Sequence, residues 1–145
     1  DAASNSLYAS DAITVEVRDG GRVVYAGIRA MPGPDEISVA MGRAVECLRA
    51  RDAGLPRAAL HIEHVDSDRL DAPDLGLLMR VAAELFRHRE TIEARVCATC
   101  LQAKELDEPA KVARDLFLGL YKPTNFKMVV GEAKARRFLA EHSES

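Results

Sequence analysis

The chain opens its regular patterning with a strict alternation of apolar and polar side chains. Positions 13, 15 and 17 are apolar and positions 14, 16 and 18 are polar, and this period of two predicts a half-buried strand. The segment Asp19-Gly20-Gly21 follows, and its glycines favour the positive φ angles of a tight hairpin turn. Residues 22–28 are then expected to return as an antiparallel strand.

Further along the chain, apolar residues recur three and four apart and predict amphipathic helices. One helix is predicted over residues 37–48, because the break at residues 31–34 precedes it and Gly54 and Pro56 end it. Residues 109–121 and 132–141 predict two further helices, and residues 57–65, 92–101 and 126–130 predict strands. The cleanest helical stripe consists of Leu75, Leu78, Met79, Ala82, Leu85 and Phe86.

The predicted element order is therefore β-β-α-β-α-β-α-β-α. Helices between the later strands imply right-handed crossovers and parallel pairing, whereas the opening hairpin is antiparallel. We expect one α/β domain over residues 11–142, with a mixed five-stranded sheet and four helices packed mainly on the face that carries Ile13, Val15, Leu60 and Ile62. Residues 1–10 are small and polar and are expected to form a flexible arm or a remnant of cloning.

The segment from Leu60 to Arg80, LHIEHVDSDRLDAPDLGLLMR, carries a family resemblance. A hydrophobic strand precedes Leu70-Asp71, and Leu75-Gly76 follows in the first turn of the second helix. This arrangement resembles the centre of STAS domains, the family of bacterial anti-sigma-factor antagonists and of the cytoplasmic tails of sulfate-type anion transporters. The element order also fits, so the resemblance covers nearly the whole chain and implies a STAS-like fold.

The turn before this helix departs from the pattern that the resemblance implies. Antagonists of the family carry a phosphorylatable Ser or Thr at the position that matches Pro73, after a small hydroxyl residue that matches Ala72. Here neither residue has a hydroxyl, and Asp74 replaces the expected Gly. By their own chemistry, Asp71 suits an N-cap, Pro73 suits a first helical turn and Asp74 complements the helix dipole. We expect a capped helix without the phosphorylation switch.

Two other groups of residues are candidates for chemistry. Cys97 and Cys100 form a CxxC motif inside a predicted strand, where residues three apart point to opposite faces. We therefore expect thiols that stay reduced and hold no metal. His61 and Glu63 share one face of their strand, with His64 on the other.

A metal site beside His61 and Glu63 would need Arg95 and Cys97 as neighbours on an adjacent strand. Such a site is conceivable, but tetrahedral coordination requires three or four convergent ligands. We prefer the simpler interpretation, in which this face is the solvated side of the sheet.

Composition narrows the classes of function. The 145 residues hold 20 Lys+Arg and 23 Asp+Glu, and the net charge of −3 gives no reason to expect nucleic acid as a partner. No apolar run approaches the roughly 20 residues of a membrane span, and three cysteines are typical of a reducing, cytoplasmic compartment. The sequence contains no nucleophile elbow, P-loop or G-x-G-x-x-G motif, so we expect no enzyme, cofactor or metal.

The leading prediction is a non-catalytic STAS-like interaction or scaffold module that binds a protein partner or a second copy of itself. The candidate contacts lie around the second helix and on the third, and they are Ser67, Asp71, Pro73, Asp74, Leu77, Leu118 and Tyr121. The alternative is a regulatory domain that binds a small ligand or nucleotide, as the resemblance to transporter tails implies. Exposure of Leu118 and Tyr121 favours the first, and a polar pocket near residues 66–71 favours the second.

Overall fold

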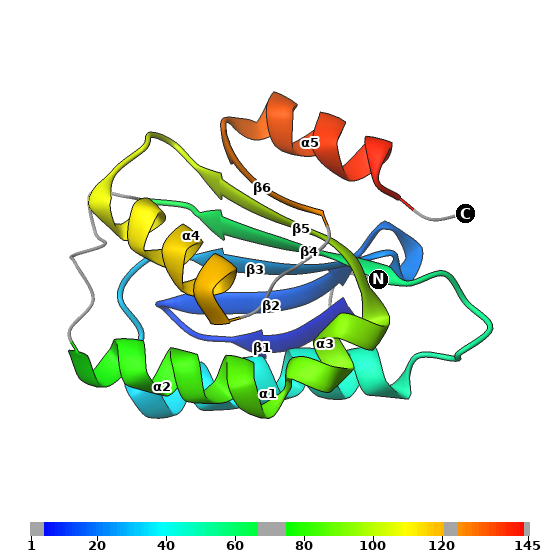
Figure 1. The fold of residues 1–145 in the computed structure, drawn as a ribbon, viewed down its shortest axis with the longest axis horizontal. Helices are drawn as coiled ribbons and strands as arrows, with labels where there is room; N and C mark the ends of the chain where they lie inside the picture. The colour runs from blue at the N-terminus through cyan, green and yellow to red at the C-terminus, as the bar shows by residue number, and fades with distance from the viewer. Residues whose placement is uncertain (1–4, 67–74, 121–124, 144–145) are drawn as a thin grey trace.

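A six-stranded mixed sheet forms the centre of the structure, which is a computed structural model that describes residues 5–66, 75–120 and 125–143 (Figure 1). The strands lie side by side in chain order: β1 (Ser6–Ala9), β2 (Ile13–Arg18), β3 (Val23–Ile28), β4 (Ala58–His64), β5 (Val96–Ala103) and β6 (Phe126–Val130). The first three strands pair antiparallel, and β3 to β6 pair parallel. The predicted α/β class and the predicted hairpin are therefore confirmed.

The turn of the hairpin is a short 3₁₀ segment, η2 (Asp19–Gly21). All three of its residues adopt positive φ angles, at 54°, 63° and 92°. Glycine reaches this region without a steric penalty, which explains why two of the three positions are Gly.

The sixth strand is β1, and its presence corrects the expected count of five. It lies in the segment expected to be a flexible arm. Its backbone pairs with the edge of β2, and the Tyr8 hydroxyl donates a hydrogen bond of 2.7 Å to Glu36 Oε2. Leu7 and Tyr8 also pack against the core, so two large side chains hold a strand that is too short to give a periodic pattern.

The described residues form five helices where the sequence predicts four. They are α1 (Pro34–Ala50), α2 (Leu75–Arg87), α3 (Arg89–Arg95), α4 (Glu108–Leu120) and α5 (Glu132–Glu141). The additional helix is α3, which occupies the start of the segment predicted as a strand from Ile92. Ile92 is buried in the core from this helix, and β5 begins only at Val96.

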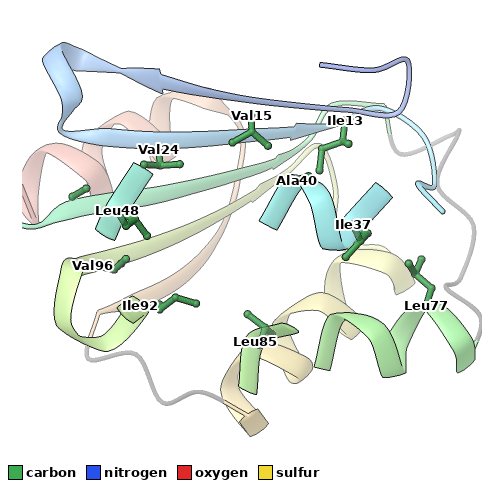
Figure 2. Close-up of a cluster of buried hydrophobic side chains, with 11 residues drawn as sticks. Ile13, Val15, Val24, Ile37, Ala40, Leu48, Leu77, Leu85, Ile92 and Val96 are labelled. Carbon is green, nitrogen blue, oxygen red and sulfur yellow. The ribbon is translucent and has the colours of Figure 1, made fainter. Parts of the chain in front are cut away.

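The helices form two layers of unequal size on the sheet. Parallel crossovers in strand order bring α1, α2 and α4 to one face, and α5 lies on the other face beside β5 and β6 (Figure 1). The larger core fills the space under the first layer and includes Ile13 and Val15, as predicted (Figure 2). β5 runs between both layers, and all eight of its residues are buried.

None of the helices in the described part of the chain is long and apolar enough to cross a membrane.

Candidate functional site

The outer surface of α2 carries a stripe of large apolar side chains, which we call the α2 stripe: Leu75, Met79 and Phe86. Their exposed fractions are 72%, 63% and 62%. Spacings of four and seven residues place them above one another on one side of the helix. Single exposed apolar residues are ordinary on protein surfaces, but an aligned group of them is typical of a contact surface.

The inner side of α2 is buried. Leu77 and Leu85 belong to the large core, and Figure 2 shows both on the side of α2 that faces the interior. Glu84 is also buried, and it accepts hydrogen bonds of 3.2 Å from Ser38 Oγ on α1 and from His88 Nε2, and one of 3.3 Å from Arg87 Nη1. These bonds replace the water that the carboxylate loses.

The buried Glu84 explains why the sequence misplaces the core side of α2. The predicted stripe combined Leu85, which is buried, with the three residues of the α2 stripe, which are exposed. A carboxylate at residue 84 made the opposite side appear polar, although hydrogen bonds permit its burial. Leu77 was expected to contact a partner; the structure corrects this, because its side chain is only 6% exposed.

The other predicted contacts divide into one that the structure describes and five that it does not. Leu118 lies on α4 and is 46% exposed, so its side chain is available at the surface. The remaining five predicted contacts lie outside the described residues, and they are Ser67, Asp71, Pro73, Asp74 and Tyr121.

The opposite face of the sheet holds a polar cluster formed by Tyr25, His61 and Gln102, which are buried, and by Glu63, which is half-buried. The parallel registers pair Tyr25 with His61 and Glu63 with Gln102. The Tyr25 hydroxyl donates to Glu63 Oε1 at 2.6 Å, and Gln102 Nε2 donates to Glu63 Oε2 at 3.3 Å. His61 Nε2 lies 2.7 Å from Gln102 Oε1, which can only accept, so His61 carries its proton on Nε2 in this arrangement.

Burial sets the charge state of this cluster. Desolvation lowers the pKa of His61, although the Gln102 hydrogen bond and the Glu63 carboxylate oppose the shift. Desolvation, followed by the hydrogen bond to Glu63, raises the pKa of Tyr25. The imidazole is therefore neutral and the phenol protonated at neutral pH, and in this state both groups donate the observed hydrogen bonds.

Gly27 and Arg18 enclose Tyr25 from two sides. A Cβ atom at Gly27 would lie only 2.7 Å from the Tyr25 hydroxyl oxygen, so the absence of a side chain there makes room for the ring. The Arg18 guanidinium carbon lies 3.4 Å from the centre of the ring, as in a cation–π contact. The cluster is thus a closed, packed network.

The structure confirms that His61 and Glu63 share a face but changes their neighbours. The register of β4 and β5 places Cys100 and Gln102 beside them, rather than Arg95 and Cys97. The face is also not solvated at His61, which is buried. Within the described ranges, no group of three or more His, Cys, Asp or Glu residues is arranged to hold a metal ion.

The sequence analysis did not identify Tyr25 and Gln102 as hydrogen-bond partners of His61 and Glu63. The alternation of β3 does separate Tyr25 from the core-facing Val24 and Ala26, so a period-two analysis of residues 22–28 could have placed it on the polar face. Gln102 requires the register of β4 against β5, which no local pattern supplies.

The two cysteines of the CxxC motif do not diverge to opposite faces as expected. Ala58 pairs with Val96 while Ala59 pairs with Ala98, so a β-bulge falls at Cys97 and resets the alternation. Cys97 and Cys100 both belong to the small core beneath α5. Burial raises the pKa of Cys100 to about 11, which keeps this thiol protonated and unreactive.

Comparison of the chain with protein-family models and with curated proteins finds no match.

Proposed function

We propose that this chain is a non-catalytic, STAS-like interaction module that binds a helical protein partner on the α2 stripe. The observation that carries the proposal is the alignment of Leu75, Met79 and Phe86 on the exposed side of one helix. Their inner neighbours hold α2 firmly against the core, so the stripe is presented on a rigid element. A rigid surface loses little conformational freedom on binding.

The charges around the stripe indicate the chemistry of the partner. Arg80, Arg87 and Arg89 are the basic residues of α2 and of the first position of α3. Arg80 forms an ion pair with Asp35 and Arg87 forms one with the buried Glu84, but the two arginine side chains remain 37% and 69% exposed. Arg89 also lies over the Phe86 ring, with 4.9 Å between its guanidinium carbon and the ring centre. An amphipathic helix whose apolar face is flanked by carboxylates complements this surface.

A second copy of the chain fits this surface less well. A two-fold contact between two α2 helices would bring the same arginines toward one another, because an isologous interface is self-complementary. Like charges placed close together oppose such an association.

The element order supports the STAS-like part of the proposal. An antiparallel hairpin followed by parallel strands in chain order, with α1, α2 and α4 on one face, agrees with what the resemblance of residues 60–80 implies. The buried cluster on the other face supports a non-catalytic role, because His61 and Glu63 are both engaged in hydrogen bonds with neighbouring side chains. Pro73 in place of a hydroxyl residue favours binding without a phosphorylation switch at that position.

Two synthetic amphipathic peptides test the proposal: one with a leucine face flanked by Glu, and one in which each Glu is replaced by Lys. We expect the Glu peptide to bind more tightly in fluorescence anisotropy. Met79→Glu should weaken its binding at least about tenfold, a change of about 1.4 kcal/mol. Leu106→Glu is the matched control, because Leu106 is similarly exposed (51%) but lies in the connection between β5 and α4 rather than on α2.

Three outcomes would contradict the proposal. The first is equal binding of the Glu peptide by the Met79→Glu and Leu106→Glu variants. The second is a wild-type dimer in sedimentation velocity that Met79→Glu dissociates, which would make a second copy the occupant. The third is flotation of the wild type, but not of Met79→Glu, with anionic phospholipid vesicles while neither peptide binds.

A further inference from the structure

A cavity of about 210 Å³ lies between the sheet and the helices α1, α2 and α4. Its walls come from β2, β3, β4 and the helices α1 to α4, and representative lining residues are Ile28, Ile62, Met41, Val81, Leu116 and Phe117. Every described side chain of the lining is apolar except that of His64. The cavity is distinct from the α2 stripe, because α2 turns its inner side toward the cavity and its outer side toward solvent.

An apolar cavity of this size, partly open to solvent, is unusual in a packed protein. Protein cores contain few voids larger than a water molecule, and the atoms that line a void lose their contacts on one side. An apolar cavity does not offer water the hydrogen bonds that it needs, and one of roughly 150 Å³ takes up benzene instead. The present cavity is larger than that and has room for a single ring with a short alkyl substituent.

His64 supplies the one polar feature of the lining. It lies at the end of β4 and is only 6% exposed, and its Nδ1 atom has no hydrogen-bond partner within the described structure. Buried polar atoms without a partner are rare in native proteins and raise the question of what satisfies them. Because His64 is one of the residues that line the cavity, a ligand there could supply the partner that its imidazole lacks.

We propose that this cavity binds a small uncharged molecule with an apolar ring or short alkyl chain and a single hydroxyl group, which hydrogen-bonds to His64. A hydroxyl both donates and accepts, so it pairs with either tautomer of a neutral imidazole. The cavity does not suit a nucleotide, because its described lining contains no Lys or Arg to pair with a phosphate. This site lies beyond the proposed docking function and does not depend on it.

Xenon provides the first test, because it enters dry apolar cavities without needing a hydrogen bond. In methyl NMR spectra of the wild-type protein, we expect xenon to shift the resonances of Ile62 and Leu116. Val129, which belongs to the small core beneath α5, is the internal control and should not shift. Absence of any shift at Ile62 and Leu116 would overturn the proposal.

A matched pair of probes, 4-propylphenol and propylbenzene, tests the role of His64. We expect both to bind in isothermal titration, and we expect the preference for the phenol over the hydrocarbon to fall at least about tenfold in His64→Leu. An unchanged preference would show that His64 does not recognise the hydroxyl and would overturn that part of the proposal.

Substitutions that fill the cavity test whether the two probes bind inside it. Ala44→Leu adds apolar volume from α1 and should weaken both probes at least about tenfold while the protein stays folded. Ala113→Leu adds volume from α4 and serves if the first variant does not fold. Met79→Glu should leave phenol binding unchanged, which separates this site from the α2 stripe. Binding that survives both filling variants would place the probes elsewhere and contradict the proposal.

Discussion

His61 and His64 lie three residues apart on β4, and the two faces of the sheet give them opposite environments. Both imidazoles are similarly buried, and desolvation lowers the pKa of both. His61 bonds to Gln102 inside a polar cluster whose members satisfy one another. The Nδ1 atom of His64 has no such partner among the described residues and lies at the edge of an apolar cavity.

The comparison shows that burial alone does not distinguish a structural histidine from a candidate ligand-binding one. A buried polar group adds to stability where its hydrogen bonds are completed and lowers it where they are not. On the face that carries α5, the polar groups of the cluster complete one another's hydrogen bonds. The other face contains the apolar cavity, and there the Nδ1 atom of His64 has no hydrogen-bond partner among the described residues.

The largest expected effect on stability comes from a substitution at Gly27 that disrupts the polar cluster around Tyr25. Gly27→Val would place a side chain against the Tyr25 hydroxyl and displace the ring from Glu63. We expect the free energy of unfolding in urea to fall by about 3 kcal/mol, since overpacking and a lost buried hydrogen bond combine. Gly42→Ala is the control: nothing lies within 4 Å of its added Cβ, and Ala should stabilise α1 by up to about 1 kcal/mol. Equal tolerance of both changes would contradict the packing described for Tyr25.

Removal of the Glu63 carboxylate, which accepts hydrogen bonds from both Tyr25 and Gln102, should have the next largest effect on stability. Glu63→Ala leaves the Tyr25 hydroxyl and the Gln102 amide without their acceptor, and we expect a loss of about 2 to 3 kcal/mol. Tyr25→Phe alone should cost about 1 kcal/mol. In a double-mutant cycle the two changes should be non-additive by at least about 0.5 kcal/mol. Glu46→Ala, on the exposed surface of α1, should change stability by less than about 0.5 kcal/mol. Additivity would mean that the two side chains do not act as one network.

Acidification tests both histidines together. Each has a folded-state pKa below its ordinary value of 6.5, so the unfolded chain binds more protons as the pH falls. The free energy of unfolding is therefore unaffected by these two histidines above about pH 6.5. Below that pH it decreases, by at most about 1.4 kcal/mol per pH unit for each histidine. Asp107 opposes the shift at His64, and Glu63 opposes it at His61.

Urea denaturation between pH 7 and pH 5.5 should show this decrease, and the slope should be smaller in His64→Leu. A stability that is constant over this range would show that neither imidazole is held neutral by burial.

The sequence predicted the elements that depend on local periodicity and failed where distant residues decide. The hairpin at Asp19-Gly20-Gly21 and the core positions Ile13 and Val15 follow from turn chemistry and alternation, and both are confirmed. The exposed side of α2 could not be predicted, because the burial of Glu84 depends on hydrogen bonds from Ser38 of α1, from Arg87 and from His88. The bulge at Cys97 likewise depends on the pairing of β5 with β4.

The smallest expected effect on stability comes from making the same substitution at His64 and at His61. His64→Leu removes a polar atom that has no partner and adds apolar contact, so we expect stability to rise by about 1 kcal/mol. His61→Leu removes the partner of Gln102 Oε1 and leaves that atom unsatisfied, so we expect a loss of about 1 to 2 kcal/mol. The two substitutions are chemically identical, lie on one strand and act at similarly buried sites, so hydrophobicity alone predicts the same sign for both. Opposite signs in urea denaturation would show that hydrogen-bond completion decides the outcome. A loss of stability in both variants would mean that His64 has a partner in the folded protein, and the cavity would then lack the polar anchor that makes a hydroxyl-bearing ligand its expected guest.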